Sequence, residues 1–210
     1  MLFAQGLRNT LIITILAAVL GVLIGVFIAT VKVYKTQTGR FGICNAVCSA
    51  YVAVIRGTPI AVQLLIFAYI VIRSNNYLLI ASLAFGLNSG AYVSELIRAG
   101  IGAVDRGQME ASLSLGLPRS TAMRRIILPQ AIKNILPALC NEFIAILKET
   151  SIVGLIAVVD LTRASDIVRS RTAEPYFPLI TIAIIYFLMV VGLTKLTSIL
   201  EKRLARSDRR

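Results

Sequence analysis

Residues 110–116 read Glu-Ala-Ser-Leu-Ser-Leu-Gly, and nine residues later the chain continues with Ile126-Ile127-Leu128-Pro129. This stretch lies in a polar segment, residues 100–134, that separates two apolar parts of the chain. Its glutamate suits the start of a short helix, because a carboxylate there interacts favourably with the helix dipole. Gly116 suits a left-handed helix end, and Pro118 suits the first turn of the next helix. The stretch predicts a helix-turn-helix elbow that docks a partner, although an ordinary re-entry loop shares this pattern.

The rest of the chain is rich in apolar residues, which make up 57% of the sequence and give a mean hydropathy of +0.82. A transmembrane helix needs about 20 predominantly apolar residues in a row. Five segments approach that length. The sequence therefore predicts an all-α integral membrane protein with one transmembrane domain over residues 1–210 and five spanning helices at about residues 10–31, 50–72, 77–98, 136–159 and 177–199.

Lysines and arginines in the connecting segments predict the orientation, because cytoplasmic loops carry an excess of them. With the N-terminus outside, fourteen face inward: Lys32, Lys35, Arg40, Arg98, Arg106, Arg119, Arg124, Arg125, Lys133, Lys202, Arg203, Arg206, Arg209 and Arg210. Five face outward: Arg8, Arg73, Arg163, Arg169 and Arg171. The polar segment and the C-terminus are therefore expected in the cytoplasm. The net charge of +12 is then a topology signal that also suits anionic membrane lipid, and we expect no nucleic-acid partner.

Few residues offer catalytic chemistry. The sequence contains no histidine, which excludes Ser-His-Asp and Cys-His systems and HExxH zinc sites. Gly-Lys never occurs, which excludes the usual phosphate-binding loop of an ATPase. All four aspartates lie in loops or the tail, at positions 105, 160, 166 and 208. The chain is expected not to be an enzyme, and we assign it no catalytic residue, no metal ligand and no cofactor of its own.

Two pairs of glycines, Gly21 with Gly25 and Gly86 with Gly90, have the small-xxx-small spacing that lets helix backbones approach closely. We expect ordinary packing inside one subunit from them. Five helices make a poor two-sided pathway on their own, so a second subunit is expected to complete it.

Polar side chains inside the predicted spans are candidates for a substrate site, because lipid penalises them. Asn88, Tyr92 and Glu95 lie at i, i+4 and i+7, which places them on one helix face. The fourth predicted span has two polar faces, one with Asn141, Lys148 and Ser151 and the other with Glu142 and Glu149.

Two interpretations of these residues stay open. In the first, Glu95 pairs with Lys148, or either residue pairs with Arg56, and the ion pair only fixes helix packing. In the second, Asn88, Tyr92 and Glu95 meet the ammonium or polar side chain of a substrate while Lys148 meets its carboxylate.

Arg56 and Thr58 belong to Arg56-Gly57-Thr58-Pro59, which opens the second predicted span with a proline suited to a first helical turn. Both are candidate pathway residues. The arginine either lines the pathway or anchors the helix at the cytoplasmic interface, and anchoring is the favoured interpretation.

The spacing of Glu110-Ala111-Ser112-x-x-x-Gly116 and Ile126-x-Leu128-Pro129 resembles the EAA loop in membrane subunits of ATP-binding cassette importers. Ser112 departs from the pattern, because the family often has a second alanine there. Three further stretches resemble the permeases for polar amino acids: Arg56-Gly57-Thr58-Pro59, residues 91–98 and Lys148-Glu149-Thr150-Ser151. The similarity covers about residues 5–200.

This resemblance implies a type I importer subunit in a bacterial inner membrane, paired with an identical or similar permease subunit. It also implies two cytoplasmic ATP-binding subunits that hold ATP and Mg²⁺, an extracytoplasmic substrate-binding protein and a polar amino acid substrate. ATPase closure would drive inward and outward alternation through the elbow. The coupling residues carried over from the family are Glu110, Ala111, Ser112, Gly116, Leu117 and Pro118.

Two other classes of function are alternatives. An ATPase-independent channel or secondary transporter also has charges inside the membrane, but it does not need the elbow. A membrane anchor for a signalling complex uses the elbow and leaves Glu95 and Lys148 unexplained. The sequence leaves open which amino acid is carried, whether the permease pair is identical, and which conformation is at rest.

Overall fold

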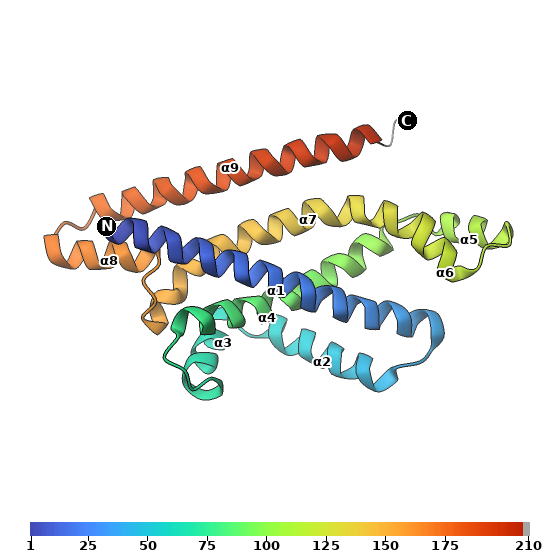
Figure 1. Cartoon of the computed structure of the whole chain (residues 1–210), viewed down its shortest axis with the longest axis horizontal. Helices are drawn as coiled ribbons and strands as arrows, with labels where there is room; N and C mark the ends of the chain where they lie inside the picture. The colour runs from blue at the N-terminus through green and yellow to red at the C-terminus, as the bar shows by residue number, and fades with distance from the viewer. Residues whose placement is uncertain (208–210) are drawn as a thin grey trace.

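The computed structural model describes the backbone of residues 1–207 and the side chains of residues 1–36 and 39–204. This part of the chain is all-helical and elongated (Figure 1). Four long helices run along it: α1 (Leu2–Thr38), α4 (Tyr77–Gly102), α7 (Leu128–Glu149) and α9 (Phe177–Ser207). The shorter elements are α2 (Gly42–Gly57), α3 (Ile60–Ile66), π-helical η1 (Phe67–Val71), α5 (Arg106–Ser114), α6 (Arg119–Ala122), π-helical η2 (Met123–Ile127), 3₁₀-helical η3 (Thr150–Ile156) and α8 (Leu161–Thr172).

The predicted outer and inner segments lie at opposite ends of the molecule. The start of α1 and helix α8 are at one end, whereas the α5–α6 elbow and the α1–α2 connection are at the other (Figure 1). Of the charged residues counted above, Asp208, Arg209 and Arg210 lie outside the described residues, as does the side chain of Arg206.

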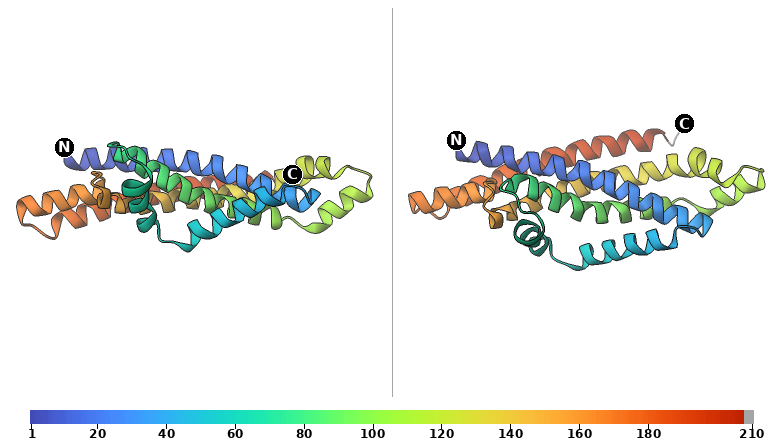
Figure 2. Two further views of the ribbon diagram at one scale, coloured as in Figure 1. Left: turned by 90° about the horizontal axis from the view of Figure 1, so that it is seen from below. Right: turned by 60° about the horizontal axis from the view of Figure 1, so that its bottom comes forward.

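Helices α1 and α4 pack side by side along a glycine seam (Figure 2). A Cβ added at Gly21 would lie 2.6 Å from Ser89 Oγ, and one added at Gly90 would lie 2.7 Å from Ile24 Cγ2. Gly25 and Gly86 meet Val93 and Leu20 in the same way. Only glycine permits backbones this close. The prediction of close packing within one subunit is confirmed.

The main apolar core lies where this seam meets α3 and η3. Its members include Ile13, Leu64, Ile80, Phe85 and Ile156, all of which are fully or almost fully buried. A second, smaller cluster joins α1, α2 and α4 through Ile28, Cys48, Val52 and Ala91. Burying these side chains contributes to stability here through close packing, since lipid is as apolar as the core.

The segment expected as one span over residues 50–72 is instead a bent pair of helices. Its two parts, Gly42–Gly57 and Ile60–Val71, meet at an angle of 109°. Thr58 is extended, with φ −123° and ψ 145°, and Pro59 precedes the first residue of α3. Proline disfavours the α region for the residue before it, which explains the break. Pro59 therefore does not open a continuous second span.

Other helix bounds also differ from the predicted ones. Three helices are long and apolar enough to cross a membrane, over Leu2–Thr36, Tyr77–Gly102 and Phe177–Leu204, and the bent pair makes up to four. The segment predicted at 136–159 is α-helical only to Glu149 and continues as the 3₁₀ element η3. Helix α7 carries four charged residues, Lys133, Glu142, Lys148 and Glu149, and is not among the apolar helices.

The start of α1 clamps the turn between η3 and α8. Asn9 Nδ2 donates to the Val159 carbonyl at 2.9 Å, and a Cβ at Gly6 would lie 2.6 Å from the Asp160 carbonyl oxygen. Asp160 caps α8 by accepting from the backbone N–H groups of Thr162 and Arg163 at 2.9 and 3.0 Å. Its side chain is fully buried, and this burial raises the pKa of the carboxyl even though the backbone donors oppose the shift.

Candidate functional site

The polar segment 100–134 folds into the predicted elbow. Asp105 caps α5, since its Oδ1 accepts from the Gly107 N–H at 2.7 Å. Gly116 is left-handed with φ 79°, as predicted, and its N–H donates to the Leu113 carbonyl at 2.9 Å. Pro118 lies one residue before α6 and not inside its first turn. The elbow extends beyond the ends of α4 and α7, to which it is joined (Figure 1).

The predicted coupling residues divide into an outer and an inner set. Glu110, Ala111, Gly116 and Pro118 are exposed, and Leu115 beside them is 82% exposed. An apolar side chain this open at the tip of the elbow suits insertion into a partner.

The inner set is buried or half-buried. Leu117 is half-buried, and Ser112 is buried with its Oγ donating to the Gln108 carbonyl at 2.5 Å. This bond explains why serine fits where the family often has alanine, because the hydroxyl is satisfied within its own helix. Ser112 is therefore buried and is not part of the exposed surface of the elbow.

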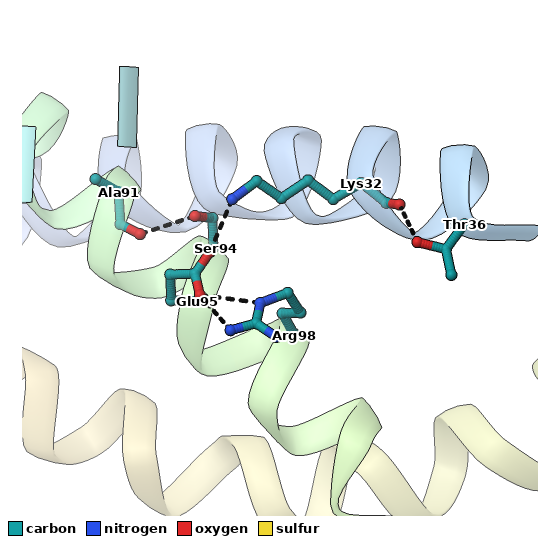
Figure 3. A network of polar contacts seen from close by, with 6 residues as sticks. All are labelled: Lys32, Thr36, Ala91, Ser94, Glu95 and Arg98. Atoms are coloured by element: carbon teal, nitrogen blue, oxygen red, sulfur yellow. Dashed lines mark hydrogen bonds and ion pairs between the residues drawn. The ribbon is translucent and has the colours of Figure 1, made fainter. Parts of the chain in front are cut away.

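Glu95 lies at the centre of an ion network between α1 and α4 (Figure 3). Its Oε1 is 2.8 Å from Lys32 Nζ, and its Oε2 is 2.6 Å from an Arg98 guanidinium nitrogen. The first interpretation paired Glu95 with Lys148 or Arg56, and the structure pairs it with Lys32 and Arg98 instead. The glycine seam brings Lys32 of α1 next to α4, and Arg98 follows Glu95 by one helical turn. These two cations therefore contact the Glu95 carboxylate.

Arg56, Tyr92 and Glu95 are brought together around one open cavity of about 330 Å³. The guanidinium carbon of Arg56 lies 5.3 Å from the centre of the Tyr92 ring, within cation–π distance. Glu142 of α7 and Arg98 of α4 line the same cavity. Among the described residues Glu142 has no cationic partner, whereas the charge of Glu95 is already compensated twice.

Three predicted substrate residues lie elsewhere. Asn88 is buried, and its Nδ2 donates to Gln63 Oε1 at 3.0 Å. Thr58 Oγ1 accepts from Gln63 Nε2 at 2.8 Å, so it belongs to the break between α2 and α3. Lys148 is exposed in the last turn of α7 and does not line the cavity.

Two residues that the structure places at the cavity and at the helix break were not among the predicted site residues. Glu142 was noticed as a charge inside a predicted span, and its lack of a cation in reach on its own helix face was the available signal. Gln63 is 5% exposed and also donates to the Ile55 and Thr58 carbonyls at 2.7 and 3.0 Å. A lone amide in an apolar run, four residues after a proline, was the signal for a residue that satisfies backbone groups freed by a helix break.

Known proteins share this architecture and sequence. A family model described as the binding-protein-dependent transport system inner membrane component matches residues 21–206. A putative glutamine transport system permease protein of Rickettsia felis is 39% identical over 95% of this chain and 91% of its own length. The arginine transport system permease protein ArtQ of Bacillus subtilis is 36% identical over 97% and 93%.

A solved structure agrees with these relatives. A crystal structure of an amino acid ABC transporter with histidines superposes with a TM-score of 0.89 at 48% identity, over 96% of this chain and 94% of that one. In this family the membrane component is not catalytic, and the ATPase is a separate subunit. The chain therefore belongs to the inner membrane components of binding-protein-dependent transport systems, and it is the multi-pass permease subunit of an ABC importer.

Proposed function

We propose that this chain forms the transmembrane pathway of an ATP-driven importer for a polar amino acid, in a complex with a second permease subunit and two ATPases. Membership of a binding-protein-dependent system implies ATPase and binding-protein partners. The relatives named for glutamine and arginine, and the neighbouring amino acid transporter, support an amino acid as cargo. Neither ATP nor Mg²⁺ is bound by this subunit in the proposal, since both belong to the partner ATPase.

The proposed topology has five spans with the N-terminus outside and the C-terminus in the cytoplasm. Helix α7 supplies the span that composition alone does not identify, since Glu142 faces a cavity and not lipid. The bent pair α2–α3 supplies another, with its broken backbone satisfied by Gln63. Irregular backbone at membrane depth is tolerated where it is buried or lines a cavity.

The substrate contacts proposed here are Arg56, Tyr92 and Glu142. A zwitterion presents a carboxylate and an ammonium group, and Arg56 and Glu142 offer the two complementary charges around one cavity. Tyr92 holds the guanidinium in place through its ring face. The observation that carries the proposal is that Glu142, which forms no ion pair with a described residue, lines one cavity together with Arg56.

The remaining predicted residues keep roles that follow from their places. Asn88 and Thr58 shape the cavity wall through Gln63, and Glu95 fixes α4 against α1. Lys148 is proposed to face the second permease subunit or the outer part of the pathway, because it is exposed on a helix that also carries Glu142. The elbow transmits ATPase closure to α4 and α7, the two helices that it joins.

ATP-dependent uptake of a panel of labelled polar amino acids tests this proposal, in proteoliposomes with the purified permease–ATPase complex and its binding protein. We expect one class of amino acid to accumulate, and Glu142→Gln to reduce uptake at least tenfold while the complex still assembles. Glu174→Gln, outside the cavity, is the matched control. Uptake without ATP or ATPase would support a channel or secondary transporter instead, and unchanged uptake by Glu142→Gln would remove this residue from the site.

A further inference from the structure

Two adjoining cavities lie at the inner end of the molecule, and the first of them borders the proposed substrate cavity at Arg98, which lines both. The first, the basic cavity, has a volume of about 520 Å³ and is lined by Lys32, Thr36, Arg98, Asp105, Arg106 and Arg119. The second, the apolar groove, has a volume of about 490 Å³ and is lined by Val26, Ile132, Leu136 and Leu139 together with residues shared with the first. Val33, Ile101 and Met123 line both, so the two cavities are continuous.

The basic cavity has uncompensated positive charge. Lys32 and Arg98 share the single carboxylate of Glu95. Arg106 and Arg119 form no ion pair with any described carboxylate, and both are exposed. Asp105 uses Oδ1 to cap α5. Four cations against two carboxylates favour an anionic occupant.

The apolar groove indicates which kind of molecule the anionic group belongs to. It runs between α1 and α7, with Ile97 and Ile101 of α4 at its floor, toward the hydrocarbon side of the basic cavity. Ile132 is 48% exposed and Val26 is 49% exposed, so the groove is open to the surroundings of the helices. An anion attached to an acyl chain satisfies both cavities at once.

We propose that these two cavities form one binding site for an anionic diacyl phospholipid, with its phosphate in the basic cavity and an acyl chain in the apolar groove. The site lies at the root of the elbow, in contact with α1, α4, α5, α6 and α7. A bound lipid therefore holds α1 to the elbow segment that the ATPase moves. The depth assigned to the groove follows from the proposed orientation.

Two other occupants fit less well. The ATPase docks on the exposed tip of the elbow, near Leu115, and a water-soluble protein does not reach a groove that faces lipid. A second copy of this chain carries the same net charge of +12, so its inner end would not neutralise the basic cavity.

Lipid retention by the purified permease–ATPase complex tests the site. Native mass spectrometry would measure bound phosphatidylglycerol and phosphatidylcholine after reconstitution in nanodiscs that contain both lipids. We expect phosphatidylglycerol to be retained preferentially, and the double substitution R106Q/R119Q to weaken its binding roughly thirtyfold, since each basic residue contributes about a fivefold factor. The matched control K202Q/R203Q removes two charges from the C-terminal part of α9 and should leave retention unchanged.

A second pair of variants tests the acyl chain. Ile132→Trp fills the groove and should also abolish retention, whereas Val19→Trp, on the exposed side of α1 outside both cavities, should not. Loss on R106Q/R119Q without loss on Ile132→Trp would show a site for phosphate alone and overturn the lipid assignment. Equal retention of the two lipids would overturn it as well. Dissociation of the permease pair by Ile132→Trp with lipid still bound would mean that the second subunit covers the groove.

Amino acid uptake separates this inference from the proposed function. If uptake persists in phosphatidylcholine alone and no lipid is retained, the lipid site is wrong and the importer assignment stands. If lipid is retained and no amino acid is taken up, the importer substrate is wrong and the lipid site stands.

Discussion

The α1–α4 seam and the bent segment α2–α3 lie next to each other and are held in place by different means. The seam is closed by four glycines and by the ion pair between Lys32 of α1 and Glu95 of α4. The bent segment turns by 109° and has exposed apolar residues such as Ile43 and Val54. Its break depends on one buried side chain, Gln63.

The difference indicates that α1 and α4 form a rigid pair, whereas α2–α3 forms a less tightly held wall of the cavity. Close glycine packing leaves α1 and α4 a single arrangement, because interiors packed this densely do not deform continuously. The bent segment places Arg56 at the cavity. Its helical path is interrupted by one extended residue, Thr58, and by one π-helical stretch, η1. Alternating access in this subunit is therefore expected to move α2–α3 relative to an α1–α4 unit that stays intact.

The largest effect is expected from Gly25→Leu, which breaks the seam. The added side chain meets the Val93 side chain and the backbone N of Ser94, which lies 3.0 Å from an added Cβ. We expect a loss of about 3 kcal/mol in the free energy of unfolding, because α1 must move away. Thermal unfolding of the purified protein measures it. Gly192→Leu, on α9 with no atom within 4 Å of an added Cβ, is the control, and equal melting of both variants would argue against a tight seam.

Gln63→Leu is expected to destabilise the bent segment α2–α3 instead. It removes three donated bonds and leaves the buried Asn88 amide without its acceptor, which should cost about 2 kcal/mol. Adding Asn88→Leu should restore part of the loss, since both polar partners are then gone. Unfolding of the two variants beside wild type measures the coupling. Additive losses would mean that the two amides do not depend on each other.

Glu95→Gln sharpens the comparison, because Glu95 belongs to the seam and also borders the substrate cavity. We expect a destabilisation of about 1 kcal/mol as Lys32 loses its ionic partner at a partly exposed site. Lys32→Met in the same chain should recover that stability. Uptake is then decisive: recovery of both stability and transport gives Glu95 a packing role only, whereas recovery of stability alone gives it a role toward the substrate.

At the elbow we expect a large effect on docking and a small one on folding. Proline cannot adopt the φ of 79° at Gly116, so Gly116→Pro reshapes the turn, and Glu110→Lys reverses an exposed charge. For Glu110→Lys the change in unfolding free energy should stay within about 0.5 kcal/mol. Copurification of the ATPase should fall for both variants and not for Glu174→Lys. Normal assembly with full transport would refute the coupling role.

The smallest effect is a pH dependence at Asp160, where the start of α1 packs against the turn before α8. Burial raises the pKa of Asp160 above its ordinary value of 3.8, so its protonated form is favoured in the folded protein. The contribution of this pKa shift to the free energy of unfolding is complete below pH 3.8 and is lost as the pH rises through the raised pKa. Asp160→Asn keeps a helix cap and should melt at a temperature that changes less with pH over this range. Parallel pH profiles of the two proteins would contradict the assignment.

Local signals predicted much of the fold. The glycine spacing predicted close helix packing, and Gly116 predicted the end of α5, because a positive φ depends on a few neighbouring residues. Glu110 was expected at the start of this helix and lies in its middle instead. The break at Thr58–Pro59 was predictable in principle from the restriction that proline places on the preceding residue. The residues around this break are mostly apolar, so the segment was predicted as one span.

Partners across helices were not predictable from spacing. Glu95 was expected to meet Lys148 or Arg56, yet the register of α1 against α4 brings Lys32 to it. Glu142 shares a cavity with Arg56 because α7 and α2 approach from different parts of the chain. Such contacts depend on how helices are placed in space, which a helical-face pattern does not contain.

The compensated charge of Glu95 has an evolutionary consequence. A residue tied to Lys32 and Arg98 is constrained by the scaffold, so changing it alters the whole α1–α4 unit. Arg56 is itself exposed and contacts the ring face of Tyr92 from the last turn of α2, so we expect its replacement to disturb the packing less. In such an architecture we expect single substitutions on α2 to change which amino acid is transported, while the helices that couple to the ATPase keep their sequence.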